Sequence, residues 1–129
     1  MLWGKPAKSK TKKELARIGE DHAARYLSSR GYRIKERNYR TPRGEIDIIA
    51  EHRDTLVFIE VKARSSDEYG TPLESVTPWK ARRIAALAAA YIGSHERRER
   101  LTRYDVVEVY LTPEGRVMRI GVVAGAFGG

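Results

Sequence analysis

The stretch GEIDIIAEHRDTLVFIEVKAR, residues 44–64, predicts a β-hairpin whose two apolar strands carry acids and a lysine. When the turn is centred between Arg53 and Asp54, the facing pairs on one side are all apolar: Ile46 with Val61, Ile48 with Ile59, and Ala50 with Val57. Matching of this kind sets the register, because a slip of one residue would turn every side chain to the other face. We therefore expect this side of the hairpin to pack on a hydrophobic core.

The opposite side of the hairpin follows from the same register. Its facing pairs are Glu45 with Lys62, Asp47 with Glu60, and Ile49 with Phe58. Because facing β-carbon atoms of an antiparallel pair lie about 4.5–5.5 Å apart, the carboxylates of Asp47 and Glu60 repel each other. Three arrangements can offset this repulsion: a bound divalent cation, a proton shared by the two acids, or a salt-bridge network with Lys62, Arg64 or Arg43.

The Glu-x-Lys spacing of Glu60 and Lys62, the apolar surroundings and the positive charge of the chain favour the cation. A metal ion held by Asp47 and Glu60 suits phosphodiester hydrolysis, because it binds a phosphate oxygen and lowers the pKa of an attacking water molecule. Lys62 can orient or deprotonate that water, or stabilise the charge that develops on the phosphorane. The backbone carbonyl of Val61 can complete the coordination.

The composition is that of one globular domain. The chain has 129 residues, of which 41% are hydrophobic and 33% charged, and a chain of this size and polarity forms a single core. No apolar run approaches the roughly 20 residues that span a bilayer, and the N-terminal residues lack the apolar segment of a secretory signal. The absence of cysteine excludes disulfides and thiolate metal sites. These features predict a cytoplasmic protein without a membrane partner.

The net charge of +8 at pH 7 and the isoelectric point near 9.9 predict a polyanionic partner. Basic proteins bind nucleic acid because neutralising phosphates releases condensed counterions. One alternative is an acidic membrane surface, which is disfavoured because no strongly amphipathic basic helix carries the charge. The other is a charge that only aids solubility. Nucleic acid is the favoured partner.

The pattern along the chain predicts the order helix, three strands, helix, two strands. Residues 1–10 are basic and aperiodic and are expected to form a flexible arm, whereas residues 11–129 form a single domain. The helices are expected over residues 11–29 and from Thr77 to about Gly93, and the strands outside the hairpin over residues 31–40, 103–111 and 116–127. The segment 65–76 has turn chemistry and the length of a functional loop. The predicted class is α/β, with a mixed central β-sheet flanked by helices.

The motifs of the hairpin resemble a known family. GEIDIIA (44–50) and FIEVKAR (58–64), followed by Lys80 in the next helix, are similar to the PD-(D/E)xK nuclease motif, with Ile46 where the motif has Pro. More closely, the chain resembles the YraN family, also called UPF0102, of predicted endonucleases related to archaeal Holliday-junction resolvases. Further matching segments are GEDHAARYL (19–27), RN (37–38) and RYDVVEV (103–109). The resemblance runs from about Gly19 to Val109.

This resemblance implies a restriction-endonuclease-like core and a Mg²⁺- or Mn²⁺-dependent endonuclease. It gives the metal-ligand positions to Asp47 and Glu60, the catalytic position to Lys62, and an additional acidic ligand position to Glu20 in the first helix. Lys80 takes a helix position where this superfamily often keeps a Lys or Gln near the site. Glu20 and Lys80 can instead be ordinary surface side chains. The resemblance also implies DNA as substrate, with branched and single-stranded forms among the candidates, and a homodimer.

Basic and aromatic residues near the predicted site are candidates for nucleic-acid binding. Phosphates can be positioned by Arg40, Arg43, Arg64, Lys80, Arg82 and Arg83, and unpaired bases can stack on Tyr69 and Trp79. For each, a solvated charge or a packed ring is the alternative. The chain has no nucleophilic triad and no glycine-rich phosphate loop, so no nucleotide cofactor is expected. A non-catalytic nucleic-acid-binding module is the second candidate function, and a protein-interaction adaptor is the third.

Overall fold

The computed structural model describes residues 9–65, 77–96 and 99–126. Within them, the elements follow the predicted order of helix, three strands, helix, two strands. They are α1 (Lys12–Ser29), β1 (Tyr32–Thr41), β2 (Gly44–His52), β3 (Thr55–Ser65), α2 (Pro78–His95), β4 (Leu101–Leu111) and β5 (Val117–Val123). Residues 1–8 of the predicted arm, and all but the first residue of the predicted loop 65–76, lie outside the described residues.

The strands form one mixed five-stranded sheet with the order β1-β2-β3-β4-β5. β3 and β4 are parallel, and the other neighbours are antiparallel. Parallel neighbours require a crossover connection, and α2 lies in the crossover between β3 and β4. The predicted α/β class with a mixed central sheet is therefore confirmed.

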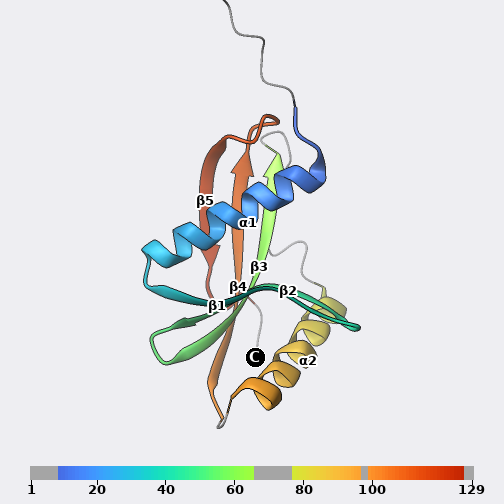
Figure 1. Ribbon diagram of the computed structural model, residues 1–129, viewed down its shortest axis with the longest axis vertical. Helices are drawn as coiled ribbons and strands as arrows, with labels where there is room; N and C mark the ends of the chain where they lie inside the picture. The colour runs from blue at the N-terminus through green and yellow to red at the C-terminus, as the bar shows by residue number, and fades with distance from the viewer. Residues whose placement is uncertain (1–8, 66–76, 97–98, 127–129) are drawn as a thin grey trace, which may run out of the picture.

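The helices lie on opposite faces of the sheet, as Figure 1 shows. α1 crosses β3, β4 and β5 on one face of the sheet. On the other face, α2 packs mainly on β2. Alternate residues of the same strands separate accordingly: Ile48 and Ile59 join the core under α1, and Ile49 and Phe58 join the core under α2. Both faces of the hairpin are therefore buried over this stretch.

The predicted hairpin register is confirmed only in its inner half. Ile48 pairs with Ile59, Ile49 with Phe58 and Ala50 with Val57, and the pairing continues to the turn, but away from the turn the ladder ends at Ile48 and Ile59. The predicted pairing of Ile46, Asp47 and Glu45 with β3 is wrong, because Asp47 Oδ2 accepts the backbone N–H of Val61 at 2.8 Å. A side chain takes the place of the next ladder bond, and Ile46 packs in the α2-side core rather than beside Ile48. The strands thus separate at the acidic end.

Both helices begin as their sequences predict. The Thr11 side chain accepts the Glu14 N–H while Glu14 accepts the Thr11 N–H, which is a capping box. Thr77 caps α2 by accepting the Lys80 N–H, and Pro78 takes the first helical position. No helix in the described part of the chain is both long enough and apolar enough to cross a membrane.

Candidate functional site

Three carboxylates from two elements meet at the open end of the hairpin. Glu20 of α1 and Glu45 and Asp47 of β2 each offer an oxygen, and these oxygens all lie within 4.8 Å of one another. Glu45 is exposed, and Glu20 and Asp47 are half-buried. We call these three residues the acidic group. The predicted proximity of Glu20 to Asp47 is present in the structure.

The close approach of α1 to β3 brings Glu20 to this position. A β-carbon at the preceding residue, Gly19, would lie 2.9 Å from the β-carbon of Ala63 in β3. Real β-carbon atoms do not come that close, so a glycine is required where the helix crosses the strand. Because Glu20 follows this contact directly, the packing of α1 on β3 fixes the distance between Glu20 and the acids of β2.

Asn38 of β1 holds two members of the acidic group. With its amide nitrogen turned toward them, Asn38 donates to Glu20 Oε1 at 2.9 Å and to Glu45 Oε1 at 3.1 Å. The backbone of Asn38 is left-handed, with φ of 54°, a conformation that asparagine adopts more readily than other non-glycine residues. The left-handed backbone therefore occurs at the residue whose amide donates two hydrogen bonds to the acidic group.

Glu60 of β3 is not part of the acidic group and is held by two lysines. Its Oε1 lies 3.1 Å from Lys62 Nζ and also pairs with Lys80 Nζ of α2. Its Oε2 is buried and finds no hydrogen-bond partner among the described residues. Such an oxygen is costly to bury, so this side of Glu60 is incompletely compensated.

A small cavity joins Glu60 to the acidic group. Its volume is about 50 Å³, which exceeds the roughly 10–15 Å³ that one water molecule needs. The lining residues come from β2, β3 and α2: Glu45, Ile46, Asp47, Phe58, Ile59, Glu60, Arg83 and Ile84. The cavity therefore has room for an ion or water between the carboxylates.

Two acids of the site, Asp47 and Glu20, have pKa values shifted toward their protonated forms. Burial raises the pKa of Asp47 to about 6 from its ordinary 3.8, the Val61 hydrogen bond opposes this, and Glu20, Glu60 and Glu45 add to it by repulsion. Burial also raises the pKa of Glu20. The pKa of Lys62 is lowered by burial and by its hydrogen bond with Lys80. The fold thus holds together groups whose charged forms are disfavoured, which is typical of functional sites.

The predicted basic residues divide into two sets around the site. Three of them contact it: Lys80 pairs with Glu60, Arg40 Nε lies 3.0 Å from Glu45, and Arg83 lines the cavity. Of the others, Arg43 is exposed at the β1–β2 turn, Arg64 lies farther along β3, and Arg82 is exposed on α2. Tyr69 lies outside the described residues.

Two site residues were missed in the sequence. The hairpin register predicts Glu45 opposite Lys62, but it lies with Glu20 and Asp47. Asn38 had no assigned role. Its left-handed backbone cannot be read from alternation, although its place in the RN segment (37–38) gave a weak signal. Val61, predicted as a carbonyl ligand, does lie beside Asp47 through its N–H, and the role of its carbonyl stays a prediction.

The sequence also matches known proteins over the segment that builds this site. Residues 19–109 match the model of the uncharacterised protein family UPF0102. The chain belongs to this family. A UPF0102 protein of Moorella thermoacetica is 50% identical over 117 residues, which cover 91% of this chain and 98% of that protein. A UPF0102 protein of Syntrophus aciditrophicus is 48% identical over 86% of this chain and 86% of its own length. A UPF0102 protein of a Parafrankia species is 47% identical over 88% of this chain and 95% of its own length.

The UPF0102 segment contains every element of the site. It begins at Gly19, which packs against Ala63 of β3, and it extends through α2 into β4. Its limits are those of the resemblance stated from the motifs, which is confirmed. The names of these UPF0102 proteins state the family and no activity.

Proposed function

We propose that this protein is a metal-dependent endonuclease that hydrolyses phosphodiester bonds in DNA, and that it acts in the cytoplasm. The observation that carries the proposal is the acidic group, whose three carboxylates lie within 4.8 Å of one another. Carboxylates so close repel one another unless a cation or protons lie between them. Oxygen ligands at this density suit Mg²⁺ or Mn²⁺.

The residues present fit such a cation by a second observation. Glu60 Oε2 is buried without a partner among the described residues, and Glu60 lines the same cavity as Asp47 and Glu45. Glu20, Glu45 and Asp47 would hold the ion, with Glu60 on the far side of the cavity. When bound, the ion supplies charge to a phosphate oxygen and acidity to a water molecule.

The lysines give the site its second chemical component. Lys62 Nζ lies 3.1 Å from Glu60 Oε1, and the pKa of Lys62 is lowered by burial. In the proposed mechanism, Lys62 orients the attacking water or stabilises the phosphorane, as a positioned cation does for developing negative charge. Lys80 pairs with the same carboxylate and thereby ties Glu60 of β3 to α2. Glu60 acts in this account by fixing both lysines beside the reaction.

A non-catalytic nucleic-acid-binding module is the second candidate. The observation in its favour is that Glu60 pairs with two lysines and that Glu45 pairs with Arg40. Ion pairs of this kind can compensate acids without a metal. The basic charge of the chain would then bind the nucleic-acid backbone with the salt dependence of counterion release. A homodimer is compatible with either function and would be measured by light scattering.

Cleavage of DNA by matched lysine variants tests the proposal. Lys62→Met is compared with Lys35→Met, because the two lysine side chains are 24% and 26% exposed and each pairs with one glutamate. With Mg²⁺ or Mn²⁺, wild-type protein and Lys35→Met should cut plasmid or branched DNA, EDTA should stop both, and Lys62→Met should be about 10²–10³-fold slower. Equal rates for the two variants would remove the role assigned to Lys62, and salt-dependent binding without cleavage by wild type would reject the nuclease in favour of the binding module.

A further inference from the structure

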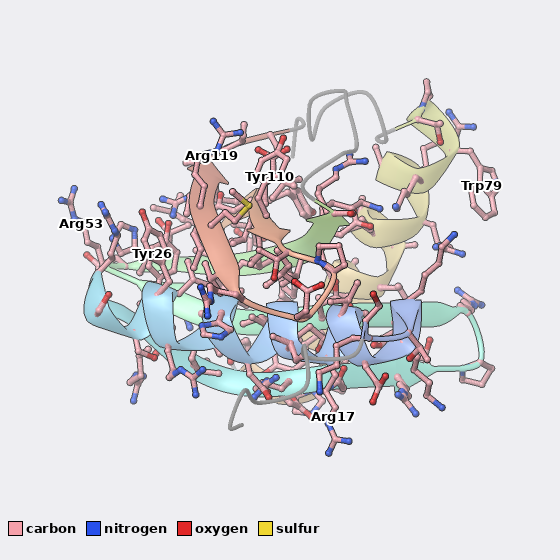
Figure 2. All side chains as sticks on the ribbon, turned by 90° about the horizontal axis from the view of Figure 1, so that it is seen from above. Arg17, Tyr26, Arg53, Trp79, Tyr110 and Arg119 are labelled. Carbon is pink, nitrogen blue, oxygen red and sulfur yellow. The ribbon has the colours of Figure 1, made fainter. Side chains whose placement is uncertain are left out.

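An exposed tryptophan stands beside the proposed site. Trp79 is 61% exposed in the first turn of α2. Figure 2 shows its ring projecting outward from α2 at the edge of the molecule. The next residue, Lys80, pairs with Glu60. An aromatic ring thus lies one residue along the helix from a lysine of the site.

The ring is held in place from two directions. Pro78 and the Thr77 cap define the start of α2, and the Arg83 guanidinium lies 4.7 Å from the centre of the Trp79 ring. A guanidinium over an indole face is a favourable cation–π arrangement. The exposed Trp79 ring therefore has a partner in Arg83 of the following helical turn.

Arg83 connects this ring to the cavity. It lines the cavity together with Asp47 and Glu60, and its Nε is buried without a hydrogen-bond partner among the described residues. A guanidinium with an unused donor is suited to a phosphate oxygen. The helix Pro78–His95 contains no acid, and two of the carboxylates that share the cavity with Arg83 have other partners: Glu45 pairs with Arg40, and Glu60 with two lysines. Trp79 and Arg83 together thus offer a stacking surface and an anion donor within one helical turn.

We propose that Trp79 and Arg83 form a binding site for an unpaired nucleobase and its phosphate, next to the acidic group. This inference rests on the proposed function for its ligand class, nucleic acid, and it narrows that class to strands with unstacked bases. In a duplex both faces of a base are already covered by its neighbours, so a surface ring finds no free face. A single strand or an extruded nucleotide has such a face, and its stacking on an aromatic ring tolerates any base.

The test measures binding in EDTA, so that it does not depend on cleavage. The chain has two tryptophans, and a Trp3→Phe background makes Trp79 the only one. Its fluorescence is followed as three probes of equal length are added: an oligothymidylate, an abasic sugar-phosphate strand and a duplex. The oligothymidylate should quench Trp79, whereas the abasic strand and the duplex should bind without quenching.

Affinity measurements use variants of matched exposure, read by labelled oligonucleotide anisotropy. Trp79→Ala should weaken oligothymidylate binding about 5- to 100-fold and duplex binding less than two-fold, and Trp79→Phe should recover much of the loss. Leu101→Ala, which removes another exposed apolar side chain far along the chain, should change neither. Arg83→Ala should weaken binding of both the oligothymidylate and the abasic strand.

The outcomes separate this inference from the proposed function. Quenching by the oligothymidylate without any metal-dependent cleavage would keep the base site and reject the nuclease. Cleavage with no quenching and no effect of Trp79→Ala would keep the nuclease and overturn the base site. Equal losses for single strand and duplex in Trp79→Ala would also overturn it, because the ring would then contribute to general binding rather than to recognition of unpaired bases.

Discussion

Two acids of this sheet lie in contrasting environments. Asp105 of β4 is fully buried and has a complete set of partners: Arg103 binds both its oxygens at 2.9 and 3.1 Å, the Tyr32 hydroxyl donates at 3.0 Å and the Gly125 N–H at 3.0 Å. Asp47 of β2 accepts one backbone N–H and otherwise meets Glu20, Glu45 and Glu60. The first arrangement stabilises the fold, whereas the second costs stability.

The contrast indicates how a structural acid differs from a functional one. Burial alone does not distinguish them, since Asp105 is the more buried. The two acids differ in how completely hydrogen bonds and opposite charges compensate their carboxylates. A native fold leaves a buried charge uncompensated mainly where a ligand completes it. The variants below test this distinction, and the expected effects decrease from one to the next.

Removal of Asp105 should give the largest effect. Asp105→Ala leaves the Arg103 guanidinium without its carboxylate and should lower the free energy of unfolding by about 3–5 kcal/mol, measured by urea denaturation. Tyr32→Phe removes a single donor to the same carboxylate and should lower it by only about 1 kcal/mol. A loss for Asp105→Ala no larger than for Tyr32→Phe would break the comparison.

Neutralising Asp47 should raise the free energy of unfolding, in contrast to the loss expected for Asp105→Ala. Between pH 3.8 and about 6 the folded state holds a proton on Asp47 that the unfolded state has lost, so the free energy of unfolding falls as pH rises through this window. The raised pKa corresponds to up to about 3 kcal/mol. Without metal, Asp47→Asn should therefore be more stable than wild type at pH 8, and the difference should vanish toward pH 4. Urea denaturation in EDTA at both pH values measures this, and a variant less stable than wild type at pH 8 would contradict it.

The approach of α1 to β3 should matter through a single β-carbon. Gly19→Ala places that atom 2.9 Å from the Ala63 β-carbon and should cost about 1–3 kcal/mol by overpacking, while moving Glu20 away from Asp47 and weakening Mn²⁺ binding. Gly93→Ala is the matched control in α2, because an added β-carbon there meets nothing within 4 Å. Calorimetric unfolding measures the stability of the two variants. Equal stability of Gly19→Ala and Gly93→Ala would contradict the role assigned to Gly19.

The amide of Asn38 should have the smallest effect. Asn38→Gly keeps a residue that accepts the left-handed backbone but removes the donor to Glu20 and Glu45. Loss of such an orienting contact should weaken Mn²⁺ binding about ten-fold, with little change in the temperature of unfolding. Arg53→Gly, which has a similar φ of 59° in the hairpin turn, serves as the control and should leave Mn²⁺ affinity unchanged. Titration of the Mn²⁺ EPR signal would measure both.

The sequence predicted the part of the fold that follows from alternation and capping. Ile48 pairs with Ile59 because strand side chains alternate, and α2 begins at Pro78 because Thr77 caps it. Alternation failed at Asp47, since the side chain competes for the Val61 N–H, and no strand pattern records that competition. The misassignment of Glu45 has a different reason, because its place beside Glu20 depends on where α1 crosses the sheet, which is a result of tertiary packing.

Binding of Mn²⁺, followed by calorimetry on wild type, Asp47→Asn and Glu45→Gln, tests the central claim that the acidic group is a cation site. Wild-type protein should bind Mn²⁺, and each variant should lose that binding while remaining folded. Glu45→Gln is the sharper variant, because only the three-dimensional arrangement assigns Glu45 to the site. Absence of Mn²⁺ binding by folded wild type, or equal affinity in all three proteins, would contradict the account.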